Sequence, residues 1–458
     1  GSNAYGIEAS ALTFFNKHAK ELTLDEATLL VSLPKAPSYY SPFGNHIEEL
    51  LGRKDYVINR MVQEGYITQE QAEEAKKQEI VFAKVAQTIK APHFVLYVQE
   101  YLFETYGQNF LEQEGYKVYT TLDWNLQQTA EKVIADNVER IKKYDANNVS
   151  LVAIDPKTGE ILAMIGSLDW FGNPYPEGCA SGKSCQFDPK LNIATYRIGR
   201  QPGSAFKPFV YVTAFQKGYD DQDTVIDELT NFGVWGDSEY IPQNYDGLFR
   251  GKVTLRQALA QSLNIPSIKV LLNLAGLQES IDTARKSGIT TLKESASYYG
   301  PAIVLGGGEV KLLDMVSAYG IFADEGIRYP PISILKIEDS KGNIIEENKK
   351  TPRRVLDEEA VRILNSILSD NDARAPIFGY NSSMYIPDYQ VAAKTGTTNN
   401  YRDAWTIGYT ANFVAGVWVG NNDNTPMEPK ASATISGPIW KSFMLEVLPK
   451  FPKQDFTP

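Results

Sequence analysis

The first third of the chain begins with apolar residues at helical spacing. In LTLDEATLLVSL (residues 22–33) they recur every three or four positions. Thr23 stands where an N-cap is expected, and Glu26 lies three residues later, as a capping box requires. Pro34 and Pro37 then end the predicted helix, because proline cannot continue one.

Two more helices are predicted in the polar stretch at residues 48–78. They are separated at Gly65 and Tyr66, and Thr68 is placed to cap the second. The helices of residues 1–80 are too few and too polar to form a complete domain. A connector follows, in which YKVYTTLDW alternates like a strand, and then a long helix from about Asn125 to Lys143.

From residue 149 onward the pattern changes to strands and helices. SLVAIDPKTGEILAMIG predicts a β-hairpin with its turn at Pro-Lys-Thr-Gly. A mostly helical stretch follows over about 203–322, and YQVAAKTGTT and DAWTIGYTANFVAGVWVGN are strands again before a closing helix. Strands at both ends with helices between them predict an α+β domain, whose sheet unites distant segments.

Composition narrows the possible chemistry. The chain has 458 residues with 45 Lys and Arg against 56 Asp and Glu, a net charge of −11, which argues against nucleic acid as a partner. No stretch has zinc-ligand spacing and no G-x-S-x-G is present, so we expect no metal, no cofactor and catalysis without histidine. The three histidines all precede residue 100: His18, His46 and His93.

The ends and the cysteines bear on where the protein works. No apolar run reaches the 18 residues of a membrane-spanning helix, and Gly1-Ser2-Asn3-Ala4 lacks an initiator Met. We therefore interpret the chain as a piece of a longer protein. Cys179 and Cys185 share one loop; they form a disulfide if the protein lies outside the cytoplasm, and otherwise are two loop thiols.

A serine and a lysine three residues apart provide the strongest candidate chemistry. Ser204 and Lys207 lie on one face of a helix that begins after Pro202-Gly203. A lysine held neutral can take the serine proton in place of histidine, and the Ser204 N–H at a helix start supplies half an oxyanion hole. Ser32 and Lys35 have the same spacing, but the intervening proline prevents their alignment.

Two further motifs are ambiguous when taken alone. Ser262-Leu263-Asn264 lies at the end of a helix stopped by Pro266, which by itself favours a polar helix terminus. Lys394-Thr395-Gly396-Thr397-Thr398 lies at the end of a strand, where Gly396 lets another backbone approach closely. A second Lys-Thr-Gly at 157–159 is explained by the hairpin turn, and GCASGKS lacks the spacing and context of an ATP-binding loop.

The three motifs in this order resemble those of the penicillin-binding transpeptidases, specifically the class A (bifunctional) penicillin-binding proteins. The surrounding sequences RQPGSAFKPF, PQNYDGLFRGKVTLRQALAQSLNIPSIKVL, LGGGEVKLLDMVSAYGIFADEG and AAKTGTTNNYRDAWTIGYT are similar to that family. KVYTTLDWNLQQTAE looks like its linker, and LTLDEATLLVSLPKAPSYYSPF looks like the tail of its glycosyltransferase domain. The resemblance covers essentially the whole chain.

The resemblance implies a fold and a domain order. We expect the penicillin-binding/β-lactamase-like fold, an antiparallel sheet flanked by helices with an inserted all-helical subdomain. Residues 1–80 would be the end of a glycosyltransferase domain, 81–148 a linker region and 149–458 the transpeptidase domain. The acidic catalytic motif of the glycosyltransferase is absent, so this chain is not expected to polymerise glycan strands.

The resemblance also implies residue roles in a serine acyl-enzyme reaction on peptidoglycan stem peptides ending in D-Ala-D-Ala. Ser204 would be the nucleophile and Lys207 its base, with a pKa lowered by burial and by Lys394. The backbone N–H groups of Ser204 and Thr397 would form the oxyanion hole, and Ser262 would relay a proton to the departing D-Ala.

Substrate binding is assigned in the same way. Asn264 would orient Lys207 and hydrogen-bond a substrate amide. The terminal carboxylate would lie against the Lys-Thr-Gly strand, which contributes the substrate-binding residues Thr395, Gly396, Thr397 and Thr398 beside Lys394. β-Lactams would acylate Ser204.

The expected partners are therefore stem peptides and β-lactams, with cell-wall synthesis or division proteins possible for the parent protein. The parent would be anchored by a membrane segment missing here, with its domains on the extracytoplasmic face of the bacterial cytoplasmic membrane. Two alternatives remain: a D,D-carboxypeptidase or β-lactamase that passes the acyl group to water, and a β-lactam sensor or scaffold.

Overall fold

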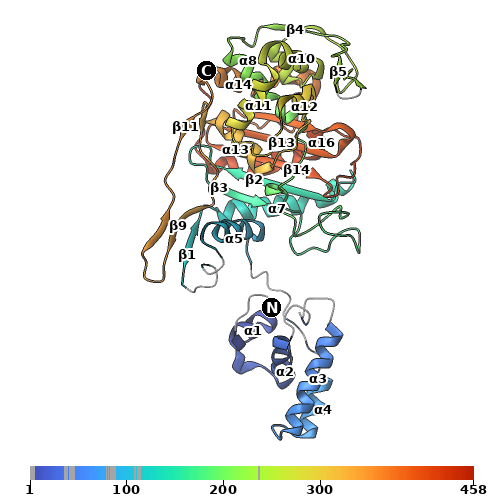
Figure 1. Ribbon diagram of the computed structural model, residues 1–458, viewed down its shortest axis with the longest axis vertical. Coiled ribbons are helices and arrows are strands. Elements are labelled where there is room, and N and C mark those ends of the chain that lie inside the picture. Colours follow the sequence, from blue (N-terminus) through green and yellow to red (C-terminus); the bar gives the residue numbers. More distant parts are fainter. Residues whose placement is uncertain are drawn as a thin grey trace. The chain divides into compact units, whose positions relative to one another are not determined.

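A computed structural model shows that the chain folds as two units, Gly1–Lys90 and Ala91–Pro458, which are described separately (Figure 1). The structure describes residues 6–35, 40, 47–78, 80, 82, 89–107, 110, 115–235 and 238–458. Pro37, His46 and the Gly1–Ala4 stretch lie outside the described residues.

The first unit is helical, as its sequence pattern predicts. The Glu26 carboxylate accepts the Thr23 N–H at 3.0 Å, so the predicted capping box forms. The Thr68 hydroxyl accepts the Gln71 N–H at 3.2 Å, so Thr68 caps α4 as predicted. A small apolar core includes Phe14, Leu29 and Leu50. The helices are α1 (Gly6–Phe15), α2 (Leu24–Ser32), α3 (Ile47–Gln63) and α4 (Gln69–Lys77), with 3-10 turns at Ala19–Glu21 and Leu33–Lys35.

The second unit is built on a five-stranded antiparallel sheet in the order β12-β13-β14-β2-β3. The predicted hairpin forms its far edge, and strands more than two hundred residues later complete it. Residue Trp418 pairs with Ser150, which joins the two distant segments. The strands are β2 (Asn148–Ile154), β3 (Ile161–Ile165), β12 (Ala392–Thr397), β13 (Asp403–Thr410) and β14 (Phe413–Gly420).

Helices cover both faces of this sheet. On β14, Val414 and Trp418 join one apolar core, whereas Val417 and Val419 join the other. Because successive side chains of a strand point to opposite faces, this division places a core on each side. Figure 1 shows α13 (Leu312–Ala323) and α7 (Trp124–Lys142) on opposite sides of the strands; α17 (Gly437–Val447) packs beside α7.

The long insertion between β3 and β12 is mostly helical, but the expectation of an all-helical subdomain is wrong in one respect. Residues 224–254 also form two small sheets, β4 (Thr224–Asp227) with β7 (Gly251–Thr254) and β5 (Val234–Trp235) with β6 (Ser238–Glu239). Strands of two to four residues carry no apolar run long enough for sequence to predict them. The helices are α8 (Lys207–Gln216), α9 (Leu255–Ala260), α10 (Asn264–Lys269), α11 (Leu277–Lys286), α12 (Ala296–Tyr299), α13, α14 (Glu358–Leu368) and α15 (Asn371–Phe378), with a π-helical stretch at Val270–Ala275 and 3-10 turns at Ile193–Thr195, Gly203–Phe206 and Gly300–Leu305.

The described residues between 91 and 148 are part of the second unit. Helix α5 (Pro92–Tyr106) contacts β3, and β1 (Lys117–Thr120) joins a three-stranded sheet in the order β1-β9-β10. The remaining elements of this unit are β8 (Ile327–Arg328), β9 (Ile334–Glu338), β10 (Ile344–Glu347), β11 (Arg353–Arg354), α16 (Ser432–Ile435) and two 3-10 turns, Asn399–Tyr401 and Leu448–Lys450.

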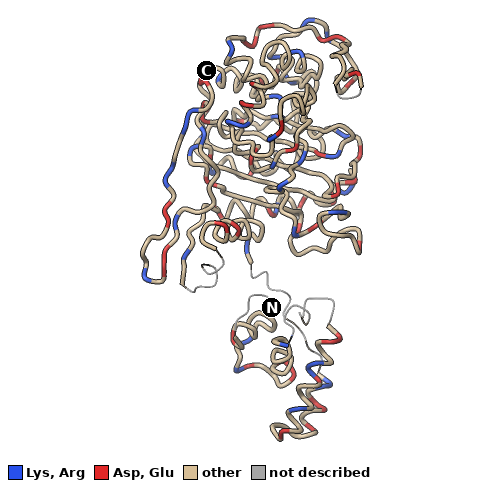
Figure 2. The backbone as a smooth tube through the Cα atoms, in the orientation of Figure 1, with Lys and Arg blue, Asp and Glu red and all other residues tan. Residues whose placement is uncertain are grey.

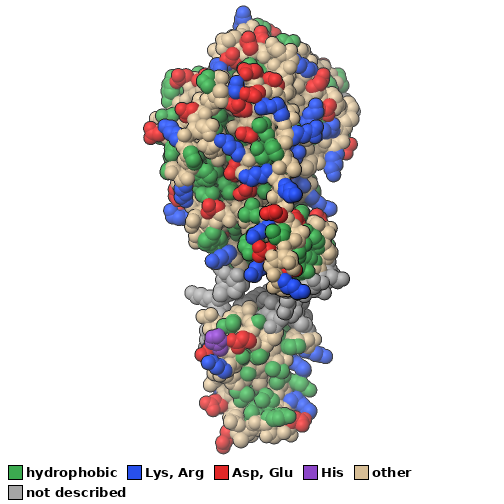
Figure 3. All heavy atoms as spheres, turned by 90° about the vertical axis from the view of Figure 1, so that its left-hand side faces the viewer, with side chains coloured by type: hydrophobic (Ala, Val, Ile, Leu, Met, Phe, Trp, Pro, Cys, Tyr) green, Lys and Arg blue, Asp and Glu red, His purple; other side chains and the backbone are tan. Residues whose placement is uncertain are grey.

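Charged residues are distributed along both units. Figure 2 shows acidic and basic positions interspersed along the backbone, and Figure 3 shows them intermingled with apolar side chains on one face. Among the described residues, no helix combines the length and the apolar character needed to cross a membrane.

Candidate active site

The candidate nucleophile lies in a tight turn that leads into a buried helix. Ser204 is half-buried in the 3-10 turn Gly203–Phe206, and α8 continues from it with Pro208 in its first turn. Gly203 has φ +56°, and a Cβ there would lie 2.6 Å from the Thr397 carbonyl oxygen. Glycine therefore satisfies both the left-handed backbone and the close approach to β12.

The side chain of Lys207 is fully buried and faces the Ser262-Leu263-Asn264 motif. Its Nζ donates to the Ser262 carbonyl at 2.7 Å, to Asn264 Oδ1 at 2.9 Å and to the Leu263 carbonyl at 3.2 Å, and it lies 3.4 Å from Ser262 Oγ. Burial, and secondly the Lys394 cation, lowers the pKa of Lys207 well below its ordinary value. This shift favours the neutral form of the lysine, which is the form that can accept a proton.

The loop that carries Ser262 differs from its prediction. Helix α9 ends at Ala260, before the motif, and Pro266 lies in the first turn of α10 instead of stopping a helix. Proline is tolerated there because first-turn N–H groups have no helical partner. Ser262 between the two helices has φ +59°, an uncommon conformation for a residue other than glycine.

Asn244 holds this loop in place, a role that sequence reasoning did not assign. Its Oδ1 accepts the Asn264 N–H at 2.8 Å, and its Nδ2 donates to the buried Asp227 carboxylate at 2.8 and 2.9 Å. The Asn264 amide Nδ2 donates to the Gln243 carbonyl at 2.8 Å. The sequence indication of this contact was the PQNYDG segment, which contains Asn244. That segment resembles the family, but no role was assigned to its residues.

The Lys-Thr-Gly motif occupies the middle and end of β12, so Lys394 is not at the strand's end as expected. Its Nζ donates to Ser262 Oγ at 2.8 Å and to the Thr395 carbonyl at 3.0 Å. Burial, and secondly the Arg374 cation on α15, lowers the pKa of Lys394 to about 7. Ser262 therefore lies between the two lysines, Lys207 and Lys394, and contacts both.

The glycine of this motif is where β12 meets the nucleophile turn. A Cβ on Gly396 would lie 1.9 Å from the Pro202 carbonyl oxygen and 3.0 Å from Ala205 Cβ. The close approach predicted for Gly396 is therefore made by the turn that carries Ser204. Thr395, beside it, is buried.

The two threonines that follow have separate partners. The Thr397 hydroxyl lies 2.8 Å from Ser432 Oγ on α16. The Thr398 hydroxyl is buried and accepts the N–H groups of Asp403 at 2.9 Å and Arg402 at 3.2 Å, which closes the turn before β13. The structure thus links Lys207, Ser262, Asn264 and Lys394 by hydrogen bonds and packs Gly396 and Thr397 against the turn that carries Ser204. The Thr398 hydroxyl is engaged in the turn before β13.

Two other features lie apart from this cluster. Cys179 and Cys185 are joined by a disulfide, with their Cα atoms 5.0 Å apart. The Ser32 hydroxyl donates to the Thr28 carbonyl of its own helix at 2.8 Å, and Lys35 lies in the following 3-10 turn, so this second S-x-x-K does not align on one helix.

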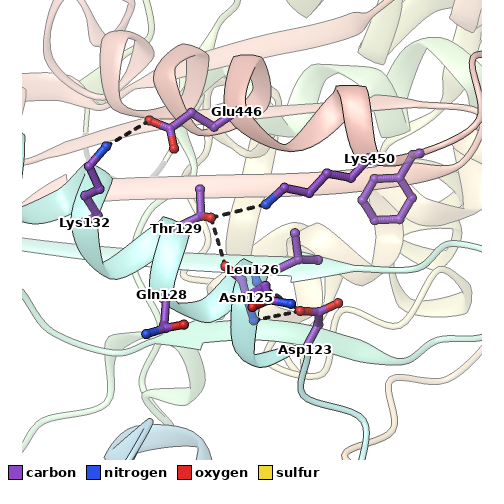
Figure 4. A pocket seen from close by; sticks show the side chains of 9 residues that line it. Asp123, Asn125, Leu126, Gln128, Thr129, Lys132, Glu446 and Lys450 are labelled. Carbon is purple, nitrogen blue, oxygen red and sulfur yellow. Dashed lines mark hydrogen bonds and ion pairs between the residues drawn. The ribbon is translucent and has the colours of Figure 1, made fainter.

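A polar groove of about 620 Å³ is lined by α7, by α17 and by the segment after α17, and by none of the three motifs (Figure 4). Lys132 pairs with Glu446 at 3.5 Å, and Lys450 Nζ lies 3.5 Å from Thr129 Oγ1. Its two lysines are thus partnered within the protein, and the groove contributes nothing to the motif cluster.

A turn that carries Ser204, two buried lysines of lowered pKa and an edge strand packed against that turn fit a serine–lysine acyl-transfer enzyme on an α+β fold. Comparison with known proteins agrees. The family model described as penicillin binding protein transpeptidase domain matches residues 149–445, and the transglycosylase model matches residues 1–62. The chain belongs to the penicillin-binding protein transpeptidase family and carries a transglycosylase fragment.

Two relatives of known sequence match the chain along its whole length. The chain is 31% identical to penicillin-binding protein 1A of Aquifex aeolicus, over all of this chain and 70% of that protein. It is 32% identical to penicillin-binding protein 2D of Bacillus subtilis, again over its whole length but only 64% of the relative, which is less than two thirds.

Solved structures show the same fold. Penicillin-binding protein 1A from Haemophilus influenzae superposes with a TM-score of 0.74 at 22% identity, covering 100% of this chain and 85% of that one. PonA1 from Mycobacterium tuberculosis in complex with penicillin V gives 0.67 at 25% identity, covering 80% of this chain and 96% of that one.

Proposed function

We propose that this chain cross-links peptidoglycan stem peptides through an acyl-enzyme on Ser204, and that β-lactams inhibit it by acylating the same serine. The observation that carries the proposal is the hydrogen-bonded path from Lys207 through Ser262 to Lys394. It joins two lysines of lowered pKa beside a half-buried serine. Such a path can move a proton without histidine.

In the acylation step Ser204 Oγ attacks the carbonyl carbon of the penultimate D-Ala, and its proton passes to neutral Lys207. The Ser204 and Thr397 N–H groups stabilise the tetrahedral oxyanion, each donor being worth about 3 to 4 kcal/mol. The C–N bond then breaks, and the departing D-Ala nitrogen takes its proton through Ser262. The amine of a second stem peptide attacks the ester, forms the cross-link and returns the proton to Ser204.

Binding of the terminal carboxylate rests on local donors. Lys394 and the Thr395 and Thr397 hydroxyls would contact it, and a protonated Lys394 would supply the positive charge in a chain whose net charge is −11. Asn264 is hydrogen-bonded to both Lys207 and Asn244. In this position its side chain would orient the lysine and hydrogen-bond the substrate's amide. In a β-lactam the ring amide replaces the scissile peptide, and no leaving group departs.

The organisation of the whole protein is part of the same proposal. Residues 1–80 are the end of a glycosyltransferase domain, 81–148 a linker region and 149–458 the transpeptidase domain. The parent protein would also polymerise glycan strands and would be anchored in the cytoplasmic membrane with its domains outside it. Cell-wall synthesis or division proteins would be its partners there.

The test is intact mass spectrometry of the chain after penicillin treatment. We expect one persistent adduct, mapped to Ser204 and absent from Ser204→Ala. Ser32→Ala, in the misaligned S-x-x-K, is the matched control and should still be acylated. An adduct that survives Ser204→Ala would refute the assignment.

Synthetic stem peptides separate the transpeptidase from its alternatives. A cross-linked dimer is expected from a donor and an acceptor peptide. Release of D-Ala without a dimer would indicate a carboxypeptidase, and rapid turnover of penicillin would indicate a β-lactamase. Stable acylation with neither product would indicate a sensor or scaffold.

A further inference from the structure

Ser432, the first residue of α16, is fully buried against the end of β12 and lies outside the three motifs. Three hydrogen bonds join it to β12. Its hydroxyl donates to the Gly396 carbonyl at 2.6 Å and lies 2.8 Å from Thr397 Oγ1, and its backbone N–H donates to Thr397 Oγ1 at 3.0 Å. One residue therefore holds both the backbone and the side chain of the Gly396–Thr397 step.

The direction of the hydroxyl protons follows from the number of donors. A serine hydroxyl has one proton, and the Gly396 carbonyl can only accept, so the Ser432 proton points to that carbonyl. In the contact between the two hydroxyls Thr397 is then the donor, and when substrate binds its proton can turn from Ser432 to the substrate carboxylate. The result is a chain from Thr397 O–H to Ser432 O–H to the Gly396 carbonyl.

This chain constrains the Thr397 N–H through covalent geometry. The Gly396 carbonyl and the Thr397 N–H belong to one planar trans peptide unit and point in opposite directions. A hydrogen bond that fixes the carbonyl therefore fixes the N–H as well. The backbone atoms of Thr397 also lie against the nucleophile turn, since a Cβ on Gly203 would be 2.8 Å from the Thr397 nitrogen.

We propose that Ser432 is a positioning residue for acyl transfer: it orients the Gly396–Thr397 peptide so that the Thr397 N–H faces the acyl carbonyl of a substrate bound at Ser204. This inference rests on the proposed function, in which that N–H stabilises the oxyanion. Ser432 itself contacts neither substrate nor the reacting atoms. It also keeps Thr397 Oγ1 in place through its own N–H, whichever way the threonine proton points.

The test compares acylation by a fluorescent penicillin in stopped flow. Ser432→Ala removes the bond to Gly396 but leaves the backbone N–H on Thr397. We expect the rate constant at saturating penicillin to fall at least tenfold, with less than a threefold change in the half-saturating concentration. Ser432→Thr, which retains a hydroxyl, should recover most of the rate.

Ser436→Ala is the matched control. Ser436 is equally buried, and its hydroxyl bonds Thr406 Oγ1 at 2.9 Å and the Ser432 carbonyl at 3.2 Å but contacts neither Gly396 nor Thr397, so it reports the loss of a buried hydroxyl beside Ser432 that leaves the Ser432 bond to Gly396 intact. It should keep the wild-type rate. If Ser432→Ala does not melt cooperatively, Ser432→Cys takes its place, and the weak thiol donor should give the same loss.

Two results would overturn the proposal: a wild-type saturating rate in Ser432→Ala or Ser432→Cys, or an equal loss in Ser436→Ala. Failure of the proposed function is distinguishable, because then the wild-type chain would form no adduct or Ser204→Ala would keep it.

Discussion

Replacing Gly396 with alanine tests whether the contact between β12 and the nucleophile turn positions the site. The new Cβ would lie 1.9 Å from the Pro202 carbonyl oxygen. A carbon–oxygen contact needs about 3.3 Å, so the strand and the turn must separate by about 1.4 Å. The obstacle is backbone, and no side-chain rotation can relieve it.

The separation has an expected magnitude for stability and for rate. Overpacking of a closely packed interior costs about 1 to 3 kcal/mol of unfolding free energy. A displacement of about 1 Å between reacting groups costs about a hundredfold in rate. Because the shift separates Ser204 from Thr397, the acylation rate should fall by about a hundredfold or more while the protein still folds.

The assay is the second-order rate constant for acylation by a fluorescent penicillin, measured beside a thermal melt. Gly320→Ala is the matched control, since its Cβ would lie 3.7 Å from Pro156, an ordinary contact, within helix α13. It should acylate normally and gain up to about 1 kcal/mol from helix propensity. A Gly396→Ala protein that acylates at the wild-type rate would refute the reasoning.

Three further outcomes are expected. Lys207→Met should fold but acylate about 10² to 10⁴ times more slowly, because Ser204 loses its base; a normal rate would assign the base elsewhere. With a Lys394 pKa of about 7, the protonated fraction of Lys394 falls about tenfold from pH 6 to pH 8. The Ser204→Ala variant, which cannot be acylated, should therefore bind penicillin about tenfold more weakly at pH 8 than at pH 6 by calorimetry. An affinity that does not change with pH would contradict the role of that charge. Replacing Cys179 and Cys185 with serine opens a loop of seven residues. The free energy of unfolding, measured with denaturant, should fall by at most about 2 kcal/mol, and the acylation rate should not change. A slower acylation would connect this loop to the site.

Sequence patterns predicted the elements whose own residues determine them. The hairpin at 150–166 formed because apolar strands flank a Pro-Lys-Thr-Gly turn, and α7 (Trp124–Lys142) lies within about one residue of its predicted bounds. The ends of elements with tertiary partners were predicted less well. Lys394 lies inside β12 because pairing with β13 extends the strand through Thr397.

The candidate residues of the three motifs do lie together, but the connections among them were not predictable. No pattern indicates that Lys207 bonds the Ser262 and Leu263 carbonyls, since these atoms are common to every residue. The left-handed backbone conformation of Ser262 and the hydrogen bonds of Asn244 depend on how α9, α10 and residues 224–254 pack together.

The sequence by itself determined the family, the order of the three motifs and the absence of histidine from the expected chemistry, because these depend only on residue types and their spacing. The tertiary structure decided which groups touch. Burial lowers the pKa values of the two lysines. The Pro202 carbonyl lies so close to Gly396 that a side chain there would collide with it, and Ser432 hydrogen-bonds Thr397, which is 35 residues away in the chain. Burial and contact are set by segments distant in sequence, and a linear pattern contains neither.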